Sequence, residues 1–558
     1  MNSPASPDSP ETVAEAVGRT LAGLGVRAVF GVVGSGNFTL VNSLRRHGAE
    51  FTAARHEGGA ATMADACSRI GGTVAVVSTH QGCGLTNALT GIAESAKSRT
   101  PMLVLTADTG RSAVLSNFRI EQDALSTSVG AVAERVHSAE SAVADTARAY
   151  RRALTDRCTV VLSVPTDLQA QAIPASQGLA PGPGAPQRAR PTQSAADALA
   201  TAIESARRPV FIAGRGGREA GPEIMALAER SGALTATSAA AHGLFRPDPF
   251  CLGISGGFSS EFTARQIRAA DLIVSFGCAL NMWTMRHGSL IGPEAQVVQV
   301  DVEQSSLGAH RPVHAEVLGD AAETAAAVRQ ELERRGAGAV KQRTAEMREL
   351  IARCSRKNAE AFEDLTGPDG IDPRRLSIAL DDALPEERVV SVDSGNFMGY
   401  PAAYLQVPDQ HGFCMTQAFQ SVGLGLYTAI GAAKASPGRL SVLGTGDGGF
   451  LMSVAELETA VRERLPLVVV VYNDAAYGAE VHHFEGTEEE LEIVRFPETD
   501  IAAVARGFGA EGLTVRTTED LEAITARLRT GVSSPLVIDA KICSDGGSWW
   551  LAEAFKGH

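Results

Sequence analysis

The feature that most constrains this chain is the stretch 444–478, GTGDGGFLMSVAELETAVRERLPLVVVVYNDAAYG. It reads as a strand end, a Gly-Asp-Gly turn, a helix-length segment and a second apolar strand, Leu467–Tyr472, that runs into Asn473. The carboxyl ends of parallel strands meet at one edge of a sheet, where open α/β folds bind ligands. We therefore expect a parallel α/β sheet that brings Asp447 and Asn473 together at that edge.

The residues at this edge suit a metal-bound diphosphate. A carboxylate oxygen from Asp447, an amide oxygen from Asn473 and a nearby main-chain carbonyl are hard ligands that can hold Mg²⁺ and leave coordination positions free. Glycine lets the backbone approach a diphosphate closely, and the turn supplies Gly446, Gly448 and Gly449. A Gly-Asp-Gly tripeptide alone also forms ordinary turns, so the prediction depends on the paired Asn473.

The whole run resembles the diphosphate- and metal-binding signature of thiamine diphosphate (ThDP) enzymes. In that family the cofactor lies between two similar α/β domains, so the resemblance implies an N-terminal partner domain. It also implies that Ala475 offers its carbonyl to the metal and that Val422 supports the bent cofactor, as Met, Ile or Leu does in relatives. Further cofactor contacts are expected at Gly395, Asn396, Gln420 and Tyr477.

The segment FTAARHEGGAATM fits the expected N-terminal partner domain, and in it Glu57 stands at a strand-to-helix junction. Taken alone, Glu57 is explained as a first-turn carboxylate that favours a helix N-terminus. The match to the family's RHE-x-x-A segment favours a catalytic role instead. The resemblance implies that Glu57 hydrogen-bonds the aminopyrimidine ring of ThDP and helps to remove the thiazolium C2 proton.

Three other N-terminal positions are candidates for contact with the substrate. His80 falls where benzoylformate decarboxylases carry an active-site histidine and acetolactate synthases a small hydroxyl residue; a strand-end histidine bonded to backbone is the alternative. Gln122 resembles a glutamine of acetolactate synthases and is also a candidate catalytic residue. Ser35, in a Gly-Ser-Gly turn, falls where some decarboxylases place a substrate-contacting serine.

Two more candidates follow Asn473, in DAAYGAEVHHF. Glu480 falls where pyruvate decarboxylase-like enzymes place a catalytic glutamate, and His483 is a candidate substrate contact close behind it. The alternative is an exposed polar helix start. A His80–Glu480 pair would suit proton delivery, because such groups titrate, or can be tuned to titrate, near the operating pH.

Composition argues against several other classes of function. The chain has 558 residues, a formal net charge of −14 and no basic cluster, which argues against nucleic acid as a partner. Its eight cysteines are scattered without a CxxC pair, which fits reduced thiols rather than a zinc site or a disulfide framework. No apolar run could span a bilayer and no signal peptide is recognisable, so we expect a cytoplasmic protein without a membrane partner.

The pattern of apolar runs, helical periods and linkers predicts three α/β domains with parallel sheets. The resemblance implies that two ThDP-binding domains, one for the pyrimidine and one for the diphosphate and Mg²⁺, flank a Rossmann-like middle domain. The expected segments are a disordered N-terminus 1–10, an N-terminal domain 11–170, a linker 171–191, a middle domain 192–335, a connecting helix and linker 336–372, a C-terminal domain 373–545 and a tail 546–558.

The middle segment contains GRGGREAG at 214–221, which is close to a dinucleotide fingerprint but lacks the G-x-G-x-x-G spacing. Acetolactate synthases bind FAD in this domain and many relatives lack it, so FAD stays open here and the altered spacing favours its absence. Further on, in CALNMWTMRHG, Trp283 or His287 could reach the active site, although core packing is the simpler explanation.

The resemblance covers about residues 10–545, and their order and length fit the acetolactate synthase-like branch. It implies a ThDP- and Mg²⁺-dependent transferase or lyase that decarboxylates a 2-oxoacid such as pyruvate and transfers the acyl carbanion to an acceptor carbonyl. His80, Gln81 and Cys83 depart from the synthase pattern. A non-oxidative 2-oxoacid decarboxylase is therefore one alternative, and a non-catalytic ThDP-fold scaffold is another. Family geometry implies a homodimer or homotetramer with the active site at the subunit interface.

Overall fold

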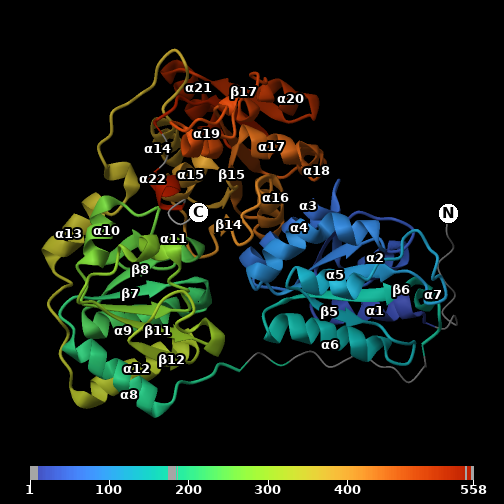
Figure 1. Ribbon diagram of the computed structural model, residues 1–558, viewed down its shortest axis with the longest axis horizontal. Coiled ribbons are helices and arrows are strands. Elements are labelled where there is room, and N and C mark those ends of the chain that lie inside the picture. The colour runs from blue at the N-terminus through green and yellow to red at the C-terminus, as the bar shows by residue number, and fades with distance from the viewer. Residues whose placement is uncertain (1–10, 174–183, 185–186, 547–548, 555–558) are drawn as a thin grey trace.

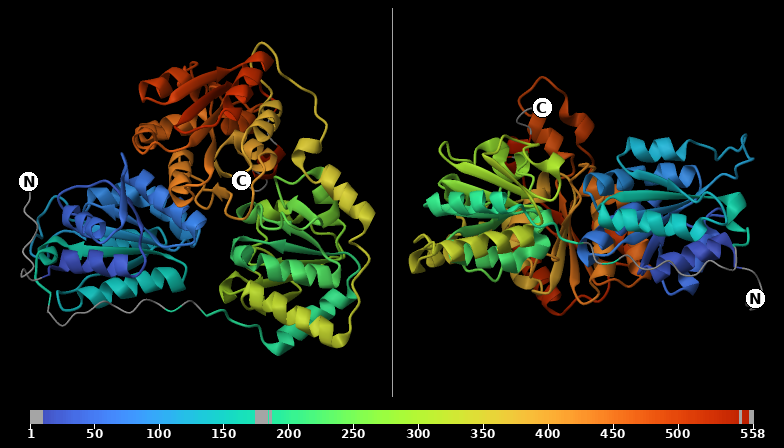
Figure 2. Two further views of the ribbon diagram at one scale, coloured as in Figure 1. Left: turned by 180° about the vertical axis from the view of Figure 1, so that it is seen from behind. Right: turned by 90° about the horizontal axis from the view of Figure 1, so that it is seen from below.

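The computed structural model describes residues 11–173, 184, 187–546 and 549–554. It contains three α/β domains, each built on a six-stranded sheet, which Figures 1 and 2 show as three lobes. The expected fold class, three domains with parallel sheets, is confirmed. The predicted disordered segment 1–10, most of the linker 171–191 and part of the tail 546–558 lie outside the described residues.

The N-terminal domain has the strand order β2-β1-β3-β4-β6-β5, with every neighbouring pair parallel. Its strands are β1 (Ala28–Gly31), β2 (Glu50–Ala53), β3 (Ala75–Thr79), β4 (Met102–Asp108), β5 (Val132–Arg135) and β6 (Thr159–Pro165). Its helices are α1 (Val13–Gly23), α2 (Phe38–Arg46), α3 (Glu57–Gly71), α4 (Cys83–Lys97), α5 (Gln122–Ser128), α6 (Ala142–Thr155) and α7 (Thr166–Gln169). The direction of winding reverses between β1 and β3, and a ligand crevice is expected beyond their carboxyl ends.

The C-terminal domain repeats this topology strand for strand, in the parallel order β14-β13-β15-β16-β18-β17. Its strands are β13 (Arg388–Val392), β14 (Phe413–Met415), β15 (Leu440–Gly446), β16 (Leu467–Asn473), β17 (Glu511–Val515) and β18 (Leu536–Lys541). Its helices are α14 (Pro373–Ala383), α15 (Gly399–Tyr404), α16 (Gly425–Ala435), α17 (Asp447–Ser453), α18 (Leu457–Arg462), α19 (Gly478–Phe484), α20 (Ile501–Gly507), α21 (Thr518–Arg529) and α22 (Trp549–Ala554). Here the winding reverses between β13 and β15.

The middle domain has the order β12-β11-β10-β7-β8-β9, which is the 3-2-1-4-5-6 order of a Rossmann fold read from β9. Its strands are β7 (Pro209–Ala213), β8 (Leu234–Thr237), β9 (Cys251–Ile254), β10 (Leu272–Phe276), β11 (Gln296–Asp301) and β12 (Ala315–Leu318). Its helices are α8 (Gln193–Ser205), α9 (Gly221–Ser231), α10 (Glu261–Arg268), α11 (Met282–Met285) and α12 (Ala321–Arg335), and α13 (Ala345–Cys354) leads on to the C-terminal domain.

One apolar core crosses the boundary between the two outer domains. It joins residues of α3, α4 and the N-terminal strands to residues of α16, β15 and β16, because α3 packs along α16. The helices approach so closely that a Cβ on Gly431 would lie 2.2 Å from the Met63 carbonyl oxygen. The middle domain instead buries two clusters of its own, one on each face of its sheet. Within the described residues, no helix combines the length and apolarity needed to cross a bilayer.

Candidate active site

A cavity of about 250 Å³ lies at the switch point of the C-terminal domain, beyond β13 and β15. The turns after these strands, the loop before α16 and the start of α19 form it. Many of the predicted cofactor and catalytic residues line it: Gly395, Asn396, Gln420, Val422, Gly446, Asp447, Gly448, Gly449, Tyr477 and Glu480. The lining does not include Asn473, Ala475 or His483, and no described residue of the N-terminal domain belongs to it.

Two carboxyl groups, the buried Asp447 and the partly buried Asp474, face each other in this cavity. Asp447 is the first residue of α17, and Asp474, which the sequence analysis missed, follows β16 directly. Burial raises the pKa of Asp447, and burial together with the Asp447 charge raises the pKa of Asp474. Two carboxyl groups in contact must share a proton or bind a cation. The pair therefore fits a divalent cation.

The rest of a cation's ligands would come from groups other than acidic or metal-binding side chains. In the part of the chain that the structure describes, no cluster of three or more His, Cys, Asp and Glu side chains could hold a metal ion. Main-chain carbonyls, water and the oxygens of a bound diphosphate are the ligands that Mg²⁺ commonly adds to one or two carboxylates.

Asn473, the predicted amide ligand, is turned away from the cavity. Its Nδ2 donates a hydrogen bond of 2.8 Å to Oδ1 of Asp539, and its Oδ1 accepts one of 3.1 Å from the backbone N–H of Ala475. Asn473 thus fixes the turn that follows β16. This geometry corrects the prediction: Asn473 orients the turn, and the neighbouring Asp474 presents an oxygen to the cavity.

The carbonyl group of Ala475, which was predicted to bind the metal, also has a partner within the protein. Its carbonyl oxygen accepts a 2.8 Å hydrogen bond from the backbone N–H of Phe496. Its φ of 54° lies in the left-handed region, which non-glycine residues seldom adopt. Ala476, not Ala475, lines the cavity, so the residues after β16 that reach the cavity lie one position beyond the two predicted ligands.

The glycines of the turn after β15 are required by contacts within the protein. A Cβ on Gly448 would lie 2.7 Å from the Tyr477 ring, and one on Gly449 would lie 2.5 Å from Oδ2 of Asp393. The ring of Tyr477 in turn packs against Phe496, with ring centroids 4.9 Å apart. The glycines therefore let side chains close over the turn, in addition to any approach by a diphosphate.

Asp393 ties together three segments that line the cavity. Its carboxylate accepts hydrogen bonds from the backbone N–H groups of Ser394 (2.8 Å) and Gly423 (3.1 Å) and from Oγ1 of Thr445 (3.0 Å). These residues belong to the turn after β13, the loop that carries Val422, and the end of β15. Burial raises the pKa of Asp393 to about 6. Asp393 is a positioning residue that the sequence analysis missed, because its partners are far apart in the chain.

The Asp393→Asn variant is expected to lower the free energy of unfolding by about 1–3 kcal/mol, because an amide NH₂ would face N–H donors in place of an acceptor oxygen. Urea denaturation followed by circular dichroism measures this. Asp382→Asn, at an exposed position, is the matched control and should stay within about 0.5 kcal/mol of wild type. Equal stability of the two variants would show that Asp393 does not hold the three segments together.

The N-terminal domain carries its candidates around its own switch point, beyond β1 and β3. Ser35 Oγ lies 3.4 Å from Nε2 of His80, and the His80 ring packs edge-on against Phe118 at 5.0 Å. Glu57 begins α3, and its Oε2 accepts a 3.1 Å hydrogen bond from Nδ2 of Asn87. These groups lie at the edge of the sheet where a ligand crevice is expected, and none of them lines the cavity of the C-terminal domain.

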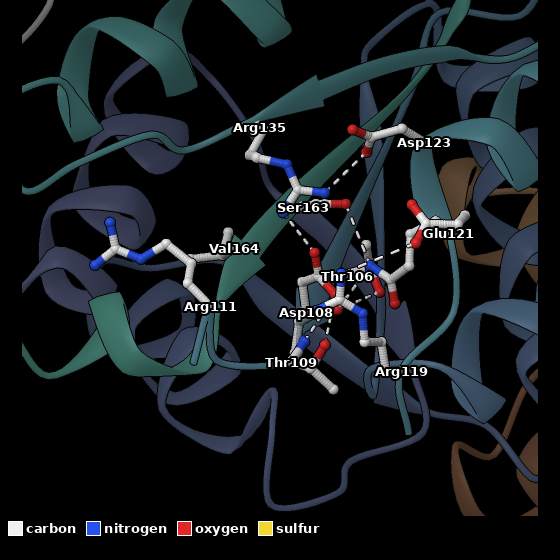
Figure 3. A network of polar contacts seen from close by, with 12 residues as sticks. Thr106, Asp108, Thr109, Arg111, Arg119, Glu121, Asp123, Arg135, Ser163 and Val164 are labelled. Atoms are coloured by element: carbon white, nitrogen blue, oxygen red, sulfur yellow. Dashed lines mark hydrogen bonds and ion pairs between the residues drawn. The ribbon is translucent and has the colours of Figure 1, made fainter. Parts of the chain in front are cut away.

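Gln122 does not present its amide to a substrate. It is 2% exposed; its Oε1 accepts from the backbone N–H of Gly82 (2.9 Å), and its Nε2 donates to the Ala107 carbonyl (3.1 Å) and to Ser163 (3.2 Å). Figure 3 shows the surrounding network at the ends of β4, β5 and β6, where Arg135 bridges Asp108 and Asp123. The predicted substrate contact and catalytic role of Gln122 are corrected: it positions the turn that follows His80.

The two candidates on α19 have different surroundings. Glu480 stands in the first turn of the helix and lines the cavity. His483 is exposed and does not line the cavity; its ring packs against Phe484, with centroids 4.7 Å apart. The placement keeps Glu480 as a candidate for contact with bound ligands, and it does not support the predicted substrate contact of His483.

Trp283 also lines the cavity, together with Met282 and Leu551, whereas His287 is exposed. The simpler explanation of Trp283 as a core residue was therefore incomplete. The stretch CALNMWTMRHG indicated a short irregular segment after a strand, but only the packing of the middle domain against the C-terminal domain brings it to the cavity.

The GRGGREAG segment of the middle domain has a packing explanation. A Cβ on Gly214 would lie 2.3 Å from the Gly277 carbonyl oxygen, and one on Gly217 would lie 2.7 Å from that of Phe276. The turn after β7 thus packs directly on the turn after β10. These glycines are accounted for without a dinucleotide, and whether this domain binds FAD stays open.

Comparison with known proteins gives three family-model matches in chain order. They are "Thiamine pyrophosphate enzyme, N-terminal TPP binding domain" over residues 11–129, "Thiamine pyrophosphate enzyme, central domain" over residues 196–328, and "Thiamine pyrophosphate enzyme, C-terminal TPP binding domain" over residues 393–540. One match falls within each of the three observed domains.

Similar curated proteins match along nearly their whole length. A sulfoacetaldehyde acetyltransferase of Castellaniella defragrans is 29% identical over 91% of this chain and 89% of its own. The probable 2-ketoarginine decarboxylase AruI of Pseudomonas aeruginosa is 30% identical over 95% and 93%. A catabolic acetolactate synthase of Raoultella terrigena is 28% identical over 92% of each chain. These names cover acyl transfer, decarboxylation and acetolactate synthesis, so similarity alone does not select one reaction.

Proposed function

Because the chain belongs to the thiamine pyrophosphate (thiamine diphosphate) enzyme family, we propose that it decarboxylates a 2-oxoacid, such as pyruvate, and transfers the acyl unit to an acceptor carbonyl. The observation that carries this proposal is the cavity at the C-terminal switch point, with Asp447 and Asp474 in contact inside it. When bound, ThDP supplies the carbanion-stabilising ylid that such a reaction needs.

Specific residues of the cavity would hold the cofactor. Asp447, Asp474 and the carbonyl of Ala476 would bind Mg²⁺, a cation that would help to hold the diphosphate. Tyr477 packs on the glycine turn and would limit access of water from that side. Val422, half-exposed at the cavity, is placed to support the cofactor rings.

The remaining catalytic groups would come from a second subunit. Glu57, Ser35 and His80 lie in the N-terminal crevice, and none of them lines the cavity of its own chain. A homodimer that apposes the N-terminal crevice of one subunit to the cavity of the other would complete the site, and two such dimers would form a homotetramer. Glu57 would then exchange a proton with the cofactor ring, and Glu480 would face the reacting atoms.

Simple non-oxidative decarboxylation is the second candidate function. Glu480 lines the cavity and His80 lies at the N-terminal crevice, so the assembled site could deliver a proton in place of an acceptor carbonyl. A non-catalytic scaffold is less well supported, because a scaffold has no need for two carboxyl groups in contact.

Mass-spectrometric product analysis separates these functions. The purified enzyme, with ThDP, Mg²⁺ and pyruvate, is incubated with and without a panel of aldehyde and oxoacid acceptors. Acetolactate or a mixed hydroxyketone supports the carboligase, and acetaldehyde with CO₂ alone supports the decarboxylase. Failure to bind ThDP in a titration with and without Mg²⁺ would contradict both.

Mixing two inactive variants tests the shared site. Glu57→Gln and Asp447→Asn subunits, mixed under conditions that allow subunit exchange, should regain about a quarter of wild-type activity, because half the dimers are mixed and one site in each is intact. Activity is measured before and after exchange, and size-exclusion chromatography with light scattering gives the oligomeric state. If both groups act within one chain, the mixture stays inactive.

A further inference from the structure

Three apolar side chains line the cavity from outside the cofactor loops. Met282 and Trp283 lie on α11 of the middle domain, and Leu551 lies on α22 near the C-terminus. Figure 1 shows α11 and α22 at the junction of the middle and C-terminal domains, and contacts join the two helices. Met282, Trp283 and Leu551 are called the apolar wall below.

The backbone around α11 is held in an unusual conformation. Leu280, Arg286 and His287 have φ values of 50°, 44° and 52°, in the left-handed region that non-glycine residues seldom adopt. The carbonyl oxygen of Trp283 accepts a 3.1 Å hydrogen bond from the backbone N–H of Gly257, which anchors the turn to the segment after β9. Strained backbone that persists because its surroundings hold it is typical of functional sites.

Two hydrogen bonds attach helix α22 to its neighbours, one to a cavity residue and one to the segment after β9. The Trp550 ring is fully buried, and its Nε1 donates a 2.9 Å hydrogen bond to the carbonyl of Asn396, a cavity residue. Nε1 of Trp549 donates a 2.5 Å hydrogen bond to the carbonyl of Gly257. Gly257 also bonds Trp283, so α22 and α11 share one anchor, and Leu551 is held against the cavity with 8% of its surface exposed.

Apart from the apolar wall, the described lining of the cavity has acidic side chains and no basic ones. Its charged side chains are the carboxyl groups of Asp447, Asp474 and Glu480, and none of the described residues that line it is Lys or Arg. On this chain's side of the proposed site, a second anionic group of a substrate would lie near these carboxyl groups or against the apolar wall. Either position leaves a charge without a partner, which is costly away from water.

We propose that the apolar wall selects a 2-oxoacid whose side chain is apolar and uncharged, and that it excludes oxoacids with a second anionic group. This inference rests on the proposed function, because it assigns the substrate class of the same site. Met282, Trp283 and Leu551 contact the substrate side chain, while the carboxyl groups stay engaged with the metal and the reacting atoms.

Steady-state kinetics of the full-length enzyme with ThDP and Mg²⁺ test the proposal on a matched panel. The panel is pyruvate, 2-oxopentanoate, 4-methyl-2-oxopentanoate and 2-oxoglutarate. The value of kcat/KM for 2-oxopentanoate should exceed that for 2-oxoglutarate by about 100-fold or more. Similar values for these two acids, which have main chains of equal length, would overturn the proposal.

The variant Trp283→Arg should weaken the discrimination, because it adds a cation opposite the second carboxylate of 2-oxoglutarate. We expect it to lower the 2-oxopentanoate to 2-oxoglutarate ratio at least about 10-fold. Leu318→Arg, at an exposed position on β12, is the matched control and should leave the ratio unchanged. An unchanged ratio in Trp283→Arg, with cofactor affinity preserved, would also overturn the proposal.

A binding measurement separates failure of this inference from failure of the proposed function. Isothermal titration of 2-oxopentanoate and 2-oxoglutarate into Glu57→Gln enzyme loaded with ThDP and Mg²⁺ requires no turnover. Tighter binding of 2-oxopentanoate supports the apolar wall even if no product forms, a result that would contradict only the proposed reaction. Equal or tighter binding of 2-oxoglutarate contradicts the apolar wall whether or not the enzyme turns over.

Discussion

The Glu57→Gln variant is expected to lose roughly 10²- to 10⁴-fold in kcat, the range that a general acid–base group contributes, while it still binds ThDP and Mg²⁺. The substitution keeps the size of the side chain and its hydrogen bond to Asn87, but it removes the carboxylate that we propose exchanges a proton with the cofactor ring. Steady-state kinetics give kcat, and fluorescence titration gives the cofactor affinity.

The control for this variant must separate proton transfer from helix stability. Glu57 is the first residue of α3, so its carboxylate also favours the helix N-terminus by about 0.3–1 kcal/mol. Glu261 holds the same position in α10, and Glu261→Gln should show the stability change without the loss of kcat. Ordinary turnover by Glu57→Gln would remove this residue from the proposed mechanism.

The Asp474→Asn variant is expected to change stability and cofactor binding in opposite directions. Without a cation, the contact with Asp447 and the burial of both groups destabilise the folded protein, so loss of one charge should raise the free energy of unfolding by about 1–3 kcal/mol. With Mg²⁺ present, replacement of a charged carboxylate ligand by a neutral amide oxygen, a weaker ligand, should weaken ThDP binding by about 10-fold. Thermal denaturation and ThDP titration, each with and without Mg²⁺, measure the two effects.

The pH dependence of the same variant provides an independent check. The pKa values of Asp447 and Asp474 are raised in the folded state, so the folded protein binds more protons than the unfolded chain. Its free energy of unfolding therefore falls as the pH rises above the ordinary carboxyl pKa of about 4. Asp474→Asn should fall less steeply, whereas Asp382→Asn should follow wild type. Parallel curves for all three proteins would show that Asp447 and Asp474 are not in contact.

The fold was predictable from sequence because its signals are local. The apolar run Leu467–Tyr472 predicted a strand, and the structure has β16 there with bounds Leu467–Asn473. Parallel strands carry their turns to one edge of the sheet, so the position of Asp447 followed from the strand before it. The equal topology of the outer domains follows only from strand pairing, which a single sequence does not reveal.

The residues after β16 that face the cavity lie one position beyond the predicted ligands for a physical reason. Successive residues of a strand point to opposite sides, and the sequence does not tell which residue at its end turns to the cavity. The hydrogen bond that Asn473 donates to Asp539 determines this, because it holds Asn473 away from the cavity and leaves Asp474 to face Asp447. Trp283 was misjudged for a similar reason, since its contact with the cavity depends on how two domains pack.

The core shared by α3 and α16 also bears on how the chain is made. The N-terminal domain leaves the ribosome first, and domains generally fold as they emerge. The apolar face of α3 that packs on α16, however, has no partner until residues 425–435 have been synthesised, after the entire middle domain. During that interval the nascent chain exposes an apolar surface on an otherwise folded domain, and such a surface is what chaperones bind and what aggregation begins from.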